Sequence, residues 1–434
     1  MARVVFTTCG SYGDIHPYLA VGLGLKRRGH QVTIATAEFY RRNVEAEGLR
    51  FHPVRPDFAP KRAPAEVIRR SFDPYTGANY LLKTLWLPYV EQSYEDLLEA
   101  CRQADLLVIH PTMFAAPLVA EKLQLKWISV VLAPSVFLSA IDPPVYPPFP
   151  WLHALRHLGP LPHRLLVRGI KALTRNWMRP IERLREREGL PVSGRCAMHD
   201  DMFSPFGTLA WFSRLLAAPQ TDWPEGTQIT GFPMYHARET GEGMDPRLRE
   251  FLDGGDPPIV FTLGSCAVVD AGSFYKDSVE AARLTGRRAV FLTGERTLPI
   301  TPNESLFFTA YAPYSELFPR AASVVHQGGI GTIGQALRAG VPMLITPLGL
   351  DQPDNAARAA RLGVARVLAR PRYTARGAAK HLDVLLNQPE YAKNARFVAA
   401  QLAREDGVET ACDALERVCA PSWDAIEEKV AIGG

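Results

Sequence analysis

The chain has 434 residues, of which 47% are hydrophobic and 22% are charged. This length predicts about two or three domains, and this composition is typical of folded globular proteins, not of disordered or fibrous ones. The formal net charge is only +4 and the lysines and arginines are dispersed, so we expect no nucleic-acid partner.

The six cysteines form no Cys-x-x-Cys pair and no ligand cluster with the histidines. We therefore expect reduced thiols in a cytoplasmic protein. The first apolar run meets Gly10 too early to form the core of a signal peptide. No apolar run approaches the roughly 20 residues needed to cross a bilayer, so any membrane contact is expected to be peripheral, at the inner face.

Short apolar runs alternate with helical patterns along the chain. The first series predicts buried parallel strands at 4–8, 31–36, 106–109 and 127–131, with helices such as 18–28 and 117–123 between them. A second series predicts strands at 259–263, 289–292, 323–326 and 343–346. Alternation of this kind is typical of an α/β protein with doubly wound parallel sheets.

A stretch rich in proline, glycine and charge, 234–246, separates the two series and is expected to be a linker. It divides an N-terminal domain, 1–233, from a C-terminal domain, 247–405. Doubly wound sheets bind ligands at the carboxyl ends of their strands. We therefore expect two Rossmann-like domains that face a central cleft.

The segment His326-Gln-Gly-Gly-Ile-Gly-Thr332 joins a predicted strand to a predicted helix. Its glycines let backbone N–H groups approach an anion, and the positive end of the helix faces that anion. The segment therefore predicts a phosphate site, although similar corners also occur only to make the turn. Upstream, Tyr311 and Ala312 offer an aromatic face and a backbone edge to a base. Downstream, Asp351 and Gln352 can bind sugar hydroxyls.

These motifs resemble those of the nucleotide-sugar-dependent glycosyltransferases of family 1, which have the GT-B fold. The resemblance covers nearly the whole chain and includes Gly10-Ser-Tyr-Gly-Asp-Ile-His-Pro17, Arg28-Gly-His-Gln-Val-Thr33, Leu263-Gly-Ser265 and 311–355. The chain is most similar to the bacterial lipid and sterol glycosyltransferases, including the rhamnosyltransferase of rhamnolipid synthesis. Membership implies that the last helix, within 406–434, crosses back to the N-terminal domain.

The resemblance also implies roles for the donor residues. The diphosphate is expected to contact His326, the hydroxyl of Ser265 and the backbone around Gly328, Gly329, Gly331 and Thr332. The base is expected at Tyr311 and Ala312, and the sugar at Asp351 and Gln352. No Asp-x-Asp motif follows a predicted strand. We therefore expect the helix dipole and His326 to replace a divalent ion, with no metal and no cofactor besides the donor.

On the acceptor side, Asp14 lies where the resembling bacterial enzymes have their general base. His16 is the alternative base, because its ordinary pKa suits proton transfer near neutral pH. Asp14 could also merely cap a helix starting near Pro17. His110 replaces the aspartate that orients the histidine in plant relatives, so Asp14 and His110 could form the same dyad with its members exchanged. A histidine lining the acceptor pocket is the other interpretation.

The nucleotide and the sugar stay open between UDP-glucose and dTDP-rhamnose. Gln335 replaces a glutamate that commonly holds ribose in uridine-dependent plant enzymes, and Tyr311 replaces a common tryptophan. The acceptor side is predicted to be aromatic and apolar, with Tyr75, Tyr80, Leu85-Trp86-Leu87, Met113-Phe114, Phe137 and 143–150. Such aromatic residues are often core instead. The acceptor is expected to be a hydrophobic small molecule or lipid with a free hydroxyl.

Residues 156–187 combine basic and apolar side chains at helical spacing. Basic residues at 164, 168, 171, 175, 179, 183, 185 and 187 are interleaved with Leu165, Leu166, Ile170, Leu173, Trp177, Met178, Ile181 and Leu184. This pattern is typical of an amphipathic helix that rests on an anionic membrane or guides an acidic lipid. A solvated helix packed on its own domain is the simpler interpretation.

Together these features predict an inverting, metal-independent transfer of a hexose from a nucleoside diphosphate to the acceptor hydroxyl. A non-catalytic sugar-nucleotide-binding partner subunit is one alternative, because its donor site could look identical. A UDP-sugar epimerase of the same fold is another, although it would be expected to surround the sugar with more ionisable residues.

Overall fold

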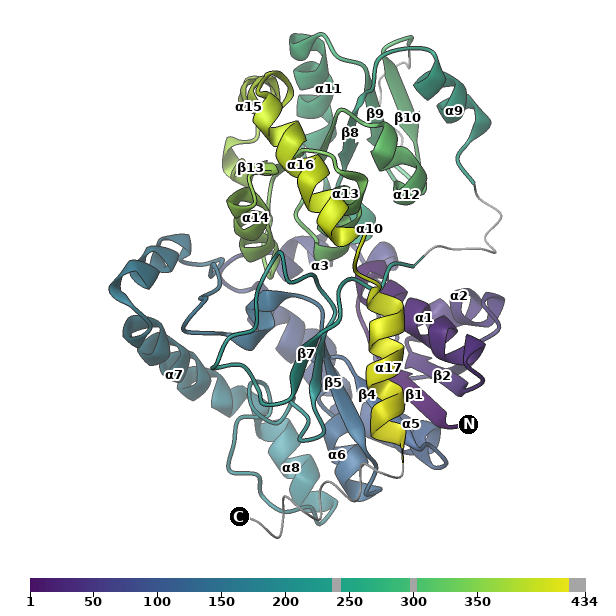
Figure 1. Ribbon diagram of the computed structural model, residues 1–434. Coiled ribbons are helices and arrows are strands. Elements are labelled where there is room, and N and C mark those ends of the chain that lie inside the picture. The colour runs from purple at the N-terminus through teal and green to yellow at the C-terminus, as the bar shows by residue number, and fades with distance from the viewer. Residues whose placement is uncertain (236–242, 297–302, 421–434) are drawn as a thin grey trace.

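The computed structural model describes residues 1–235, 243–296 and 303–420. It contains two parallel sheets, each in its own α/β domain, with the C-terminal domain above the N-terminal one in Figure 1. The strand orders are β3-β2-β1-β4-β5-β6-β7 and β10-β9-β8-β11-β12-β13. Both sheets run outward in two directions from a central strand, which is the doubly wound pattern. The expected α/β class with two Rossmann-like domains is confirmed.

The N-terminal sheet consists of β1 (Arg3–Thr7), β2 (Gln31–Thr36), β3 (Arg50–Pro53), β4 (Leu106–Ile109), β5 (Trp127–Val131), β6 (Thr208–Ala210) and β7 (Thr227–Ile229). The α-helices of this half before β5 are α1 (Tyr12–Arg27), α2 (Arg41–Ala46), α3 (Ala65–Ser71), α4 (Gly77–Tyr80), α5 (Val90–Cys101) and α6 (Ala116–Lys122). Between β5 and β6 come η6 (Pro150–Leu158), α7 (Leu161–Arg175), η7 (Asn176–Met178) and α8 (Arg179–Arg187).

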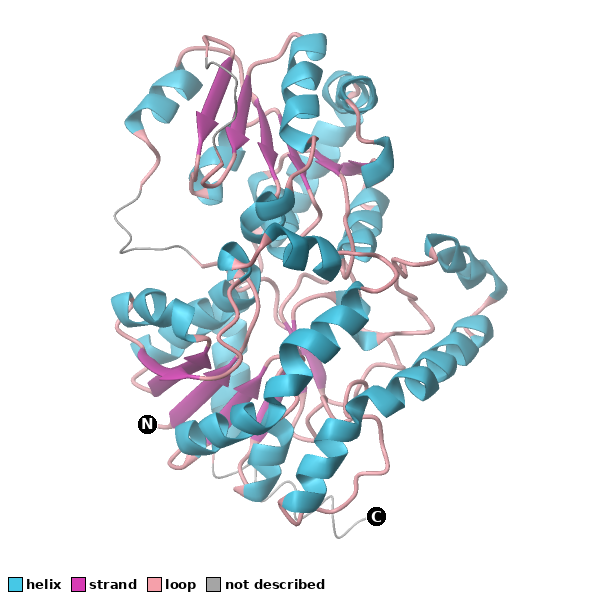
Figure 2. Ribbon diagram, turned by 180° about the vertical axis from the view of Figure 1, so that it is seen from behind, coloured by secondary structure: helices cyan, strands magenta, loops and turns pink. Residues whose placement is uncertain are grey.

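The C-terminal sheet consists of β8 (Ile259–Thr262), β9 (Ala289–Leu292), β10 (Leu306–Thr309), β11 (Ser323–His326), β12 (Met343–Ile345) and β13 (Ala365–Val367). Its α-helices are α9 (Pro246–Asp253), α10 (Gly264–Ala267), α11 (Phe274–Thr285), α12 (Tyr314–Leu317), α13 (Ile330–Ala339), α14 (Gln352–Arg361), α15 (Ala375–Asn387) and α16 (Pro389–Leu402). Figure 2, from the opposite side, shows helices flanking the strands of both sheets. The central strands β4, β5, β8, β9 and β11 are buried along their whole length, which requires their continuous apolar sequences.

Residues 236–242 of the expected linker and 421–434 of the expected C-terminal segment lie outside the described residues. None of the helices in the described ranges is long and apolar enough to cross a membrane.

The first helix starts earlier than the sequence indicates. α1 begins at Tyr12 and contains Pro17, instead of starting near it. Ser11 caps the helix by accepting the Gly13 N–H at 3.2 Å, while the Asp14 carboxylate accepts the Ser11 N–H at 2.7 Å. This capping box satisfies amides at the helix start, so the helix tolerates the one hydrogen bond that a proline removes.

The last described helix, α17 (Gly407–Cys419), leaves the C-terminal domain and runs along α1 (Figure 1). Its buried residues Cys412 and Leu415 belong to the same core as Val21 and Leu25 of α1. Arg28 then pairs with acidic residues of α17, among them Asp413 and Glu416, each at 2.7 Å. The chain therefore passes from the N-terminal to the C-terminal domain and back, and α17 completes the N-terminal core.

The contact between α1 and α17 depends on Gly24, and we predict that Gly24→Ala lowers the melting temperature. A β-carbon at this position would lie 2.6 Å from the sulfur of Cys412, which forces α17 to move. Overpacking costs about 1–3 kcal/mol, more than the roughly 0.5–1 kcal/mol that alanine gains over glycine in a helix. Gly169→Ala in α7 is the matched control, because a β-carbon there would meet no atom within 4 Å. It should raise the melting temperature; an equal rise in both variants contradicts the prediction.

Candidate active site

The candidate residues lie where the strand order of each sheet reverses. In the N-terminal sheet the connections after β1 and β4 diverge; Asp14 lies in the first turn of α1, after β1, and His110 directly follows β4. In the C-terminal sheet the loops after β8 and β11 diverge in the same way, beside Ser265 and His326. These topological switch points are where doubly wound sheets bind ligands, so each domain brings one pair of candidate residues to its carboxyl edge.

Asp14 and His110 face each other across the first switch point. One oxygen of Asp14, Oδ2, accepts the N–H and the hydroxyl of Ser11 at 2.7 and 3.0 Å. The other, Oδ1, lies 3.6 Å from Nε2 of His110, which is longer than a hydrogen bond. Asp14 is therefore both a capping residue and a carboxylate with one uncommitted oxygen, so the two interpretations of this residue do not exclude each other.

The orientation of His110 is set by its neighbour Thr112. The Thr112 N–H donates to Nδ1 of His110 at 3.3 Å, and the Thr112 hydroxyl lies 2.7 Å from the same nitrogen. Burial lowers the pKa of His110, although the charge of Asp14 opposes this. The neutral ring therefore carries its proton on Nε2, directed at Asp14.

Two further residues extend this hydrogen-bond chain away from the cleft. The thiol of Cys9 lies 3.2 Å from the Thr112 hydroxyl, and the indole N–H of Trp86 donates to the same sulfur at 3.0 Å. Burial raises the pKa of Cys9 to about 11, so the thiol keeps its proton and can donate to Thr112. Sequence reasoning assigned Trp86 to the acceptor side and Cys9 to no site.

His16 lies apart from this pair, on another face of α1. Its ring packs between Tyr12 and Tyr235, with centroid distances of 5.1 and 4.7 Å. Burial lowers the pKa of His16 to about 4, which makes it a weaker base near neutral pH than an ordinary histidine. Its neighbours and its pKa both favour a packing role.

His326 ends β11 inside the C-terminal domain and is fully buried. Its Nδ1 accepts the Gly328 N–H at 3.0 Å, while Nε2 has no partner among the described residues. Burial lowers the pKa of His326 to about 3, so the ring is neutral and its proton is on Nε2. An unpaired buried N–H is costly, and it marks a position where a ligand oxygen would be bound.

The same corner holds a second unpaired group, on Gln327. Its amide oxygen is buried and has no partner in the described part of the chain, and its amide nitrogen would lie 2.5 Å from a β-carbon on Gly264. Gly264 has φ +67° and is therefore a glycine for both conformational and steric reasons. Gln327 belongs to the sequence motif. A glutamine at this position can separate His326 from the glycines or line the site with its amide, and the sequence alone does not distinguish these two roles.

The glycines after His326 build the start of α13. Gly328 has φ +92°, and a β-carbon there would lie 2.9 Å from Ile345, so no larger residue fits. Gly329 precedes the first helical residue, while a β-carbon on Gly331 would meet no atom within 4 Å. Thr332 is buried within the first turn. The N–H groups of this turn and the positive helix end face open space beside Gly331, as an anion site requires.

The expected base and phosphate contacts lie on neighbouring loops. Ser265 is partly exposed in α10, directly after β8. Tyr311 is 53% exposed, whereas the adjacent Ala312 is buried. Tyr311 therefore presents a ring surface on which a base can stack, and Ala312 contributes only its backbone.

Asp351 and Gln352 begin α14 on the other side of the phosphate corner. Asn355, one turn later, donates to Oδ2 of Asp351 at 2.6 Å and to the Gly328 carbonyl at 3.2 Å. It thereby ties the sugar residues to the glycine corner, a role that the sequence did not indicate. The amide oxygen of Gln352 accepts the Leu348 N–H at 3.0 Å, so only its N–H₂ group remains for a ligand.

The charge of Asp14 in the N-terminal domain affects the pKa of Asp351 in the C-terminal domain. Burial raises the pKa of Asp351 to about 6. The hydrogen bond from Asn355 lowers this pKa, whereas the negative charge of Asp14 in the other domain raises it further. The domains also touch nearby, because a β-carbon on Gly349 would lie 2.4 Å from the Phe72 carbonyl oxygen. The general-base candidate therefore lies near enough to influence the ionisation of the sugar-binding candidate.

Comparisons with known proteins agree with the fold. Residues 4–136 match the glycosyltransferase family 28 N-terminal domain, and residues 296–415 match the erythromycin biosynthesis protein CIII-like C-terminal domain. The chain is 32% identical over 429 residues to O-mycaminosyltylonolide 6-deoxyallosyltransferase from Streptomyces fradiae, covering 95% of this chain and 97% of that protein. The chain belongs to the GT-B nucleotide-sugar-dependent glycosyltransferases.

More distant relatives extend the same relationship. The sterol 3-beta-glucosyltransferase of Debaryomyces hansenii is 26% identical over 94% of this chain, which spans only 26% of that longer protein. The solved structure of the glycosyltransferase VinC in complex with dTDP matches with a TM-score of 0.66 and 20% identity, covering 96% of this chain and 99% of that one. This likeness shows that the GT-B fold is shared.

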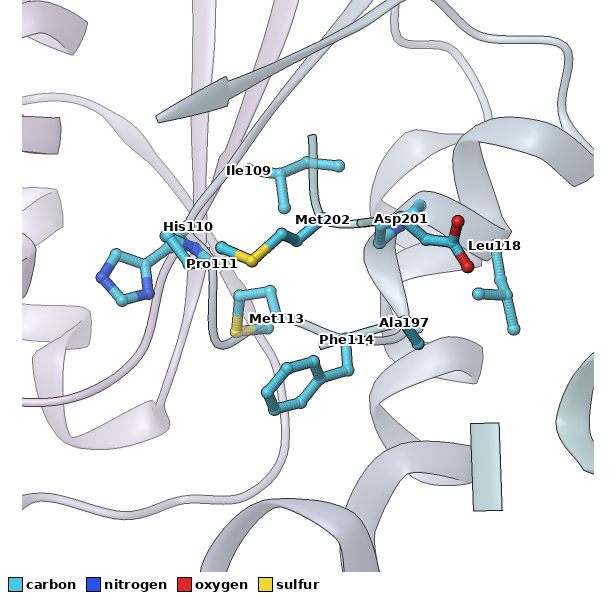
Figure 3. Close-up of a pocket in the computed structure, with 10 residues that line it drawn as sticks. Ile109, His110, Pro111, Met113, Phe114, Leu118, Ala197, Asp201 and Met202 are labelled. Atoms are coloured by element: carbon cyan, nitrogen blue, oxygen red, sulfur yellow. The ribbon is translucent and has the colours of Figure 1, made fainter. Parts of the chain in front are cut away.

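A pocket of the glycosyltransferase lies directly behind His110 (Figure 3). Met113, Phe114 and Met202 line it together with Pro111 and Asp201. A second pocket on the other side of the same loop is lined by Trp86, Thr112, Met113 and Phe114. Of the expected acceptor residues, Phe137 is instead core, because it stacks on Trp223 at 4.2 Å.

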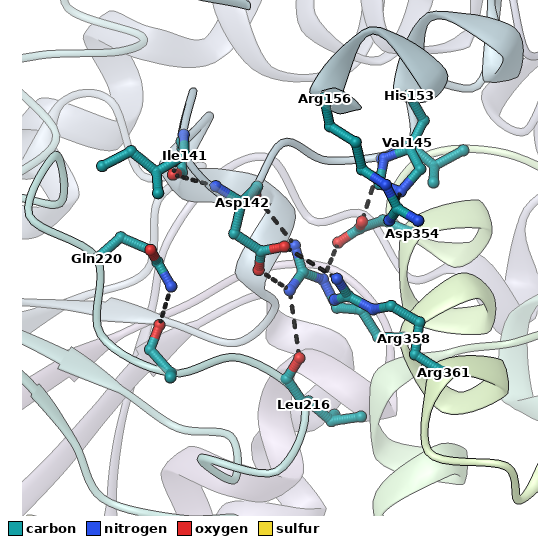
Figure 4. Close-up of polar contacts among 12 residues, drawn as sticks. Ile141, Asp142, Val145, His153, Arg156, Leu216, Gln220, Asp354, Arg358 and Arg361 are labelled. Atoms are coloured by element: carbon teal, nitrogen blue, oxygen red, sulfur yellow. Dashed lines mark hydrogen bonds and ion pairs between the residues drawn. The ribbon is translucent and has the colours of Figure 1, made fainter. Parts of the chain in front are cut away.

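One ionic cluster joins the domains beside the sugar residues; we call Asp142, Asp354, Arg358 and Arg361 the interdomain cluster (Figure 4). Arg358 of α14 pairs with Asp142 of the N-terminal domain and donates to Asp354 at 2.7 Å, while Arg361 reaches Asp142 at 3.1 Å. Asp354 also accepts the Val145 N–H at 3.1 Å. Burial opposes ionisation of Asp142, but the two arginines outweigh it and lower its pKa.

We predict that Arg358→Ala destabilises the protein by about 3–5 kcal/mol, because it removes the arginine partner of the buried Asp354 and one of the two arginine partners of Asp142. Arg361→Ala is the matched control: its side chain is 41% exposed against 2% for Arg358, so it should cost at most about 1 kcal/mol. Urea unfolding measures both. In the parent protein, the contribution of Asp142 is present above about pH 4 and is lost as the pH falls through its lowered pKa. Equal losses in the two variants would refute the assignment.

Proposed function

We propose that this enzyme transfers a hexose from dTDP-rhamnose or UDP-glucose to a hydroxyl of a hydrophobic small-molecule or lipid acceptor, with inversion and without a metal ion. The observation that carries this proposal is the unpaired Nε2–H of His326, which ends β11 ahead of α13, together with the uncommitted oxygen of Asp14 in the other domain. The N–H of His326 suits a departing diphosphate, and the Asp14 oxygen suits the proton of an incoming hydroxyl.

The dTDP donor is the better supported of the two. VinC, which shares the fold, was solved with dTDP, and the Streptomyces relative is named for transfer of 6-deoxyallose, which like rhamnose is a 6-deoxyhexose. Gln335 supports the same choice, since the glutamate of many uridine-dependent relatives is absent. The base would stack on Tyr311, and Asp351 with Gln352 would bind the sugar hydroxyls.

Departure of the diphosphate requires that its growing negative charge be stabilised. The N–H groups at the start of α13 and the Nε2–H of His326 are fixed donors in a buried setting, which makes them effective without reorganisation. The hydroxyls of Ser265 and Thr332 would add neutral donors. In the described part of the chain, no group of three His, Cys, Asp or Glu side chains is arranged to hold a metal. We propose that the neutral donors carry this task.

Proton removal falls to Asp14. Its Oδ1 is free of capping contacts, and the proton of His110 is already on the nitrogen that faces it. His110 therefore cannot accept a proton at Nε2 while Thr112 donates to Nδ1. Its Nε2 lies 3.6 Å from Oδ1 of Asp14, so a small approach of the two groups would let His110 donate to the carboxylate and position it. This is the exchanged dyad, in which aspartate is the base and histidine the positioning residue. The two pockets beside Met113 and Phe114 have volumes of about 10 Å³ each, which suit a water-sized group and not a larger part of the acceptor.

We predict that His326→Ala weakens binding of dTDP and dTDP-sugars by roughly 10- to 150-fold, the equivalent of a charge-assisted hydrogen bond of about 1.5–3 kcal/mol. Because this residue is buried, His326→Leu serves as a second variant that fills the space without an N–H group. Isothermal titration with dTDP, and separately with UDP, gives the affinities and identifies the preferred nucleotide. A folded variant with unchanged affinity for both nucleotides rules out the phosphate contact.

Asp14→Asn should lower kcat by about 10²–10⁴, the usual contribution of a positioned general base, with little change in dTDP affinity. Ser11→Ala is the matched control, because it disturbs the same helix cap but leaves the carboxylate in place. It should lower the melting temperature and keep most of the activity. His16→Gln should cost less in turnover than Asp14→Asn. If His16→Gln abolishes transfer while Asp14→Asn stays active, the base is His16.

A single displacement with one base opposite the diphosphate inverts the anomeric centre. We therefore predict that an α-linked dTDP-sugar gives a β-linked product, and a β-linked donor an α-linked product. The anomeric coupling constants in the product NMR spectrum measure this, and a retained configuration excludes the mechanism.

A further inference from the structure

The helical excursion between β5 and β6 presents apolar side chains to solvent. In the stretch η6 and α7, which we call the η6–α7 arm (residues 150–175), five large apolar residues are between 57% and 75% exposed. They are Trp151, Leu158, Leu161, Leu165 and Leu173. In Figures 1 and 2 the arm projects sideways from the N-terminal domain. Within α7, which the structure describes completely, the only buried side chains are His163 and Thr174.

The excursion is not the single amphipathic helix that the sequence suggests. It breaks at η7, and Pro180 at the start of α8 cannot continue the preceding hydrogen bonds. Ile181 and Leu184 of α8 are buried in the N-terminal core, so α8 is a helix packed on its own domain. The arm differs from α8, because the five large apolar residues named above are exposed to solvent.

The exposed residues of α7 form one continuous row. Leu161, Leu165, Gly169 and Leu173 follow each other at intervals of four residues, which places them on one helix face. A second row, shifted by one residue, contains Arg164 and Arg168. The surface is therefore an apolar stripe bordered by positive charge, the arrangement of helices that lie in a membrane interface.

The charged residues in and around the η6–α7 arm, apart from histidine, are all positive. Residues 143–181 contain six lysines or arginines and no aspartate or glutamate. Arg164 and Arg168 are exposed and form no ion pair or hydrogen bond within the described ranges, whereas Arg41 on another surface pairs with Glu38 at 2.6 Å. The two arginines are available for negative groups outside the chain.

We propose that the η6–α7 arm rests on the surface of an anionic lipid bilayer, with its leucines and Trp151 at the acyl boundary and its arginines at the lipid phosphates. Its projecting shape suits a deformable surface, and its uniform positive charge suits a uniformly negative one. A second copy of the chain fits less well, because a symmetric contact between two arms brings like charges together. The surface is separate from the transfer chemistry and does not depend on the proposed donor or acceptor.

In sequence, the η6–α7 arm follows closely after residues that contact the C-terminal domain. It follows directly from Asp142 and Val145, which bind α14 through the interdomain cluster. Docking through the arm would therefore hold the cleft near the bilayer.

Co-sedimentation with vesicles tests the proposal. The full-length protein should bind vesicles of phosphatidylcholine mixed with phosphatidylglycerol, and bind much less to phosphatidylcholine alone. Arg164→Gln with Arg168→Gln should reduce the partition coefficient about 25-fold, since each arginine near an anionic surface contributes about a factor of five. Leu161→Ser with Leu165→Ser should reduce it by about ten-fold or more. Raised salt should weaken the binding of the parent protein.

Matched variants on the C-terminal domain separate the arm from general charge and hydrophobicity. Arg376→Gln with Lys380→Gln removes an exposed basic pair of the same spacing from α15, and Phe397→Ser removes a 64% exposed aromatic residue from α16. Both should bind like the parent protein. Equal loss in the control and arm variants, or no binding of the parent to anionic vesicles at low salt, overturns the proposal. So does a concentration-dependent dimer that is lost in the arm variants while vesicle binding is absent.

Discussion

The placement of the two domains depends on one buried charge. The guanidinium of Arg358 is 2% exposed and is neutralised by Asp354 of its own helix and by Asp142 of the other domain. A charge in that position is tolerated only with its partners present, so the domains are held together at α14. The same helix begins with the sugar residues Asp351 and Gln352. The ionic contact that joins the two domains therefore lies on the helix that starts at Asp351 and Gln352, the residues proposed to bind the sugar.

Both half-sites use a histidine in the same way. His110 directly follows the buried strand β4 and His326 ends the buried strand β11, and each accepts at Nδ1 the backbone N–H of the residue two positions later. This fixes the proton on Nε2, and burial lowers both pKa values so that neither ring is charged near neutral pH. In one domain the fixed N–H faces Asp14; in the other it has no partner among the described residues. The repeated geometry gives one positioning group and one ligand-binding group.

The sequence by itself determined the parts that follow local physical rules. Continuous apolar runs indicated the central strands, because a strand covered on both faces by helices has no polar side to display. The glycine corner after His326 was recognisable as a turn, since Gly328 has a positive φ that favours glycine; the ligand-binding roles of this corner and of residues 351 and 352 stay predictions. Short strands at or near the sheet edges were missed: β3 and β13 expose part of their length, so they lack a continuous apolar run.

The tertiary structure decided everything that depends on distant residues meeting. Asp142 and Arg358 are 216 positions apart, and no sequence pattern around either residue predicts that the two form an ion pair. Asn355 reached the Gly328 carbonyl, 27 positions away in the chain, only when folding placed α14 beside the glycine corner. The start of α1 also differed from expectation, because a capping box between Ser11 and Asp14 outweighed the helix-breaking tendency of Pro17. Local sequence carries propensity and spacing, whereas long-range pairing depends on the relative placement of two domains.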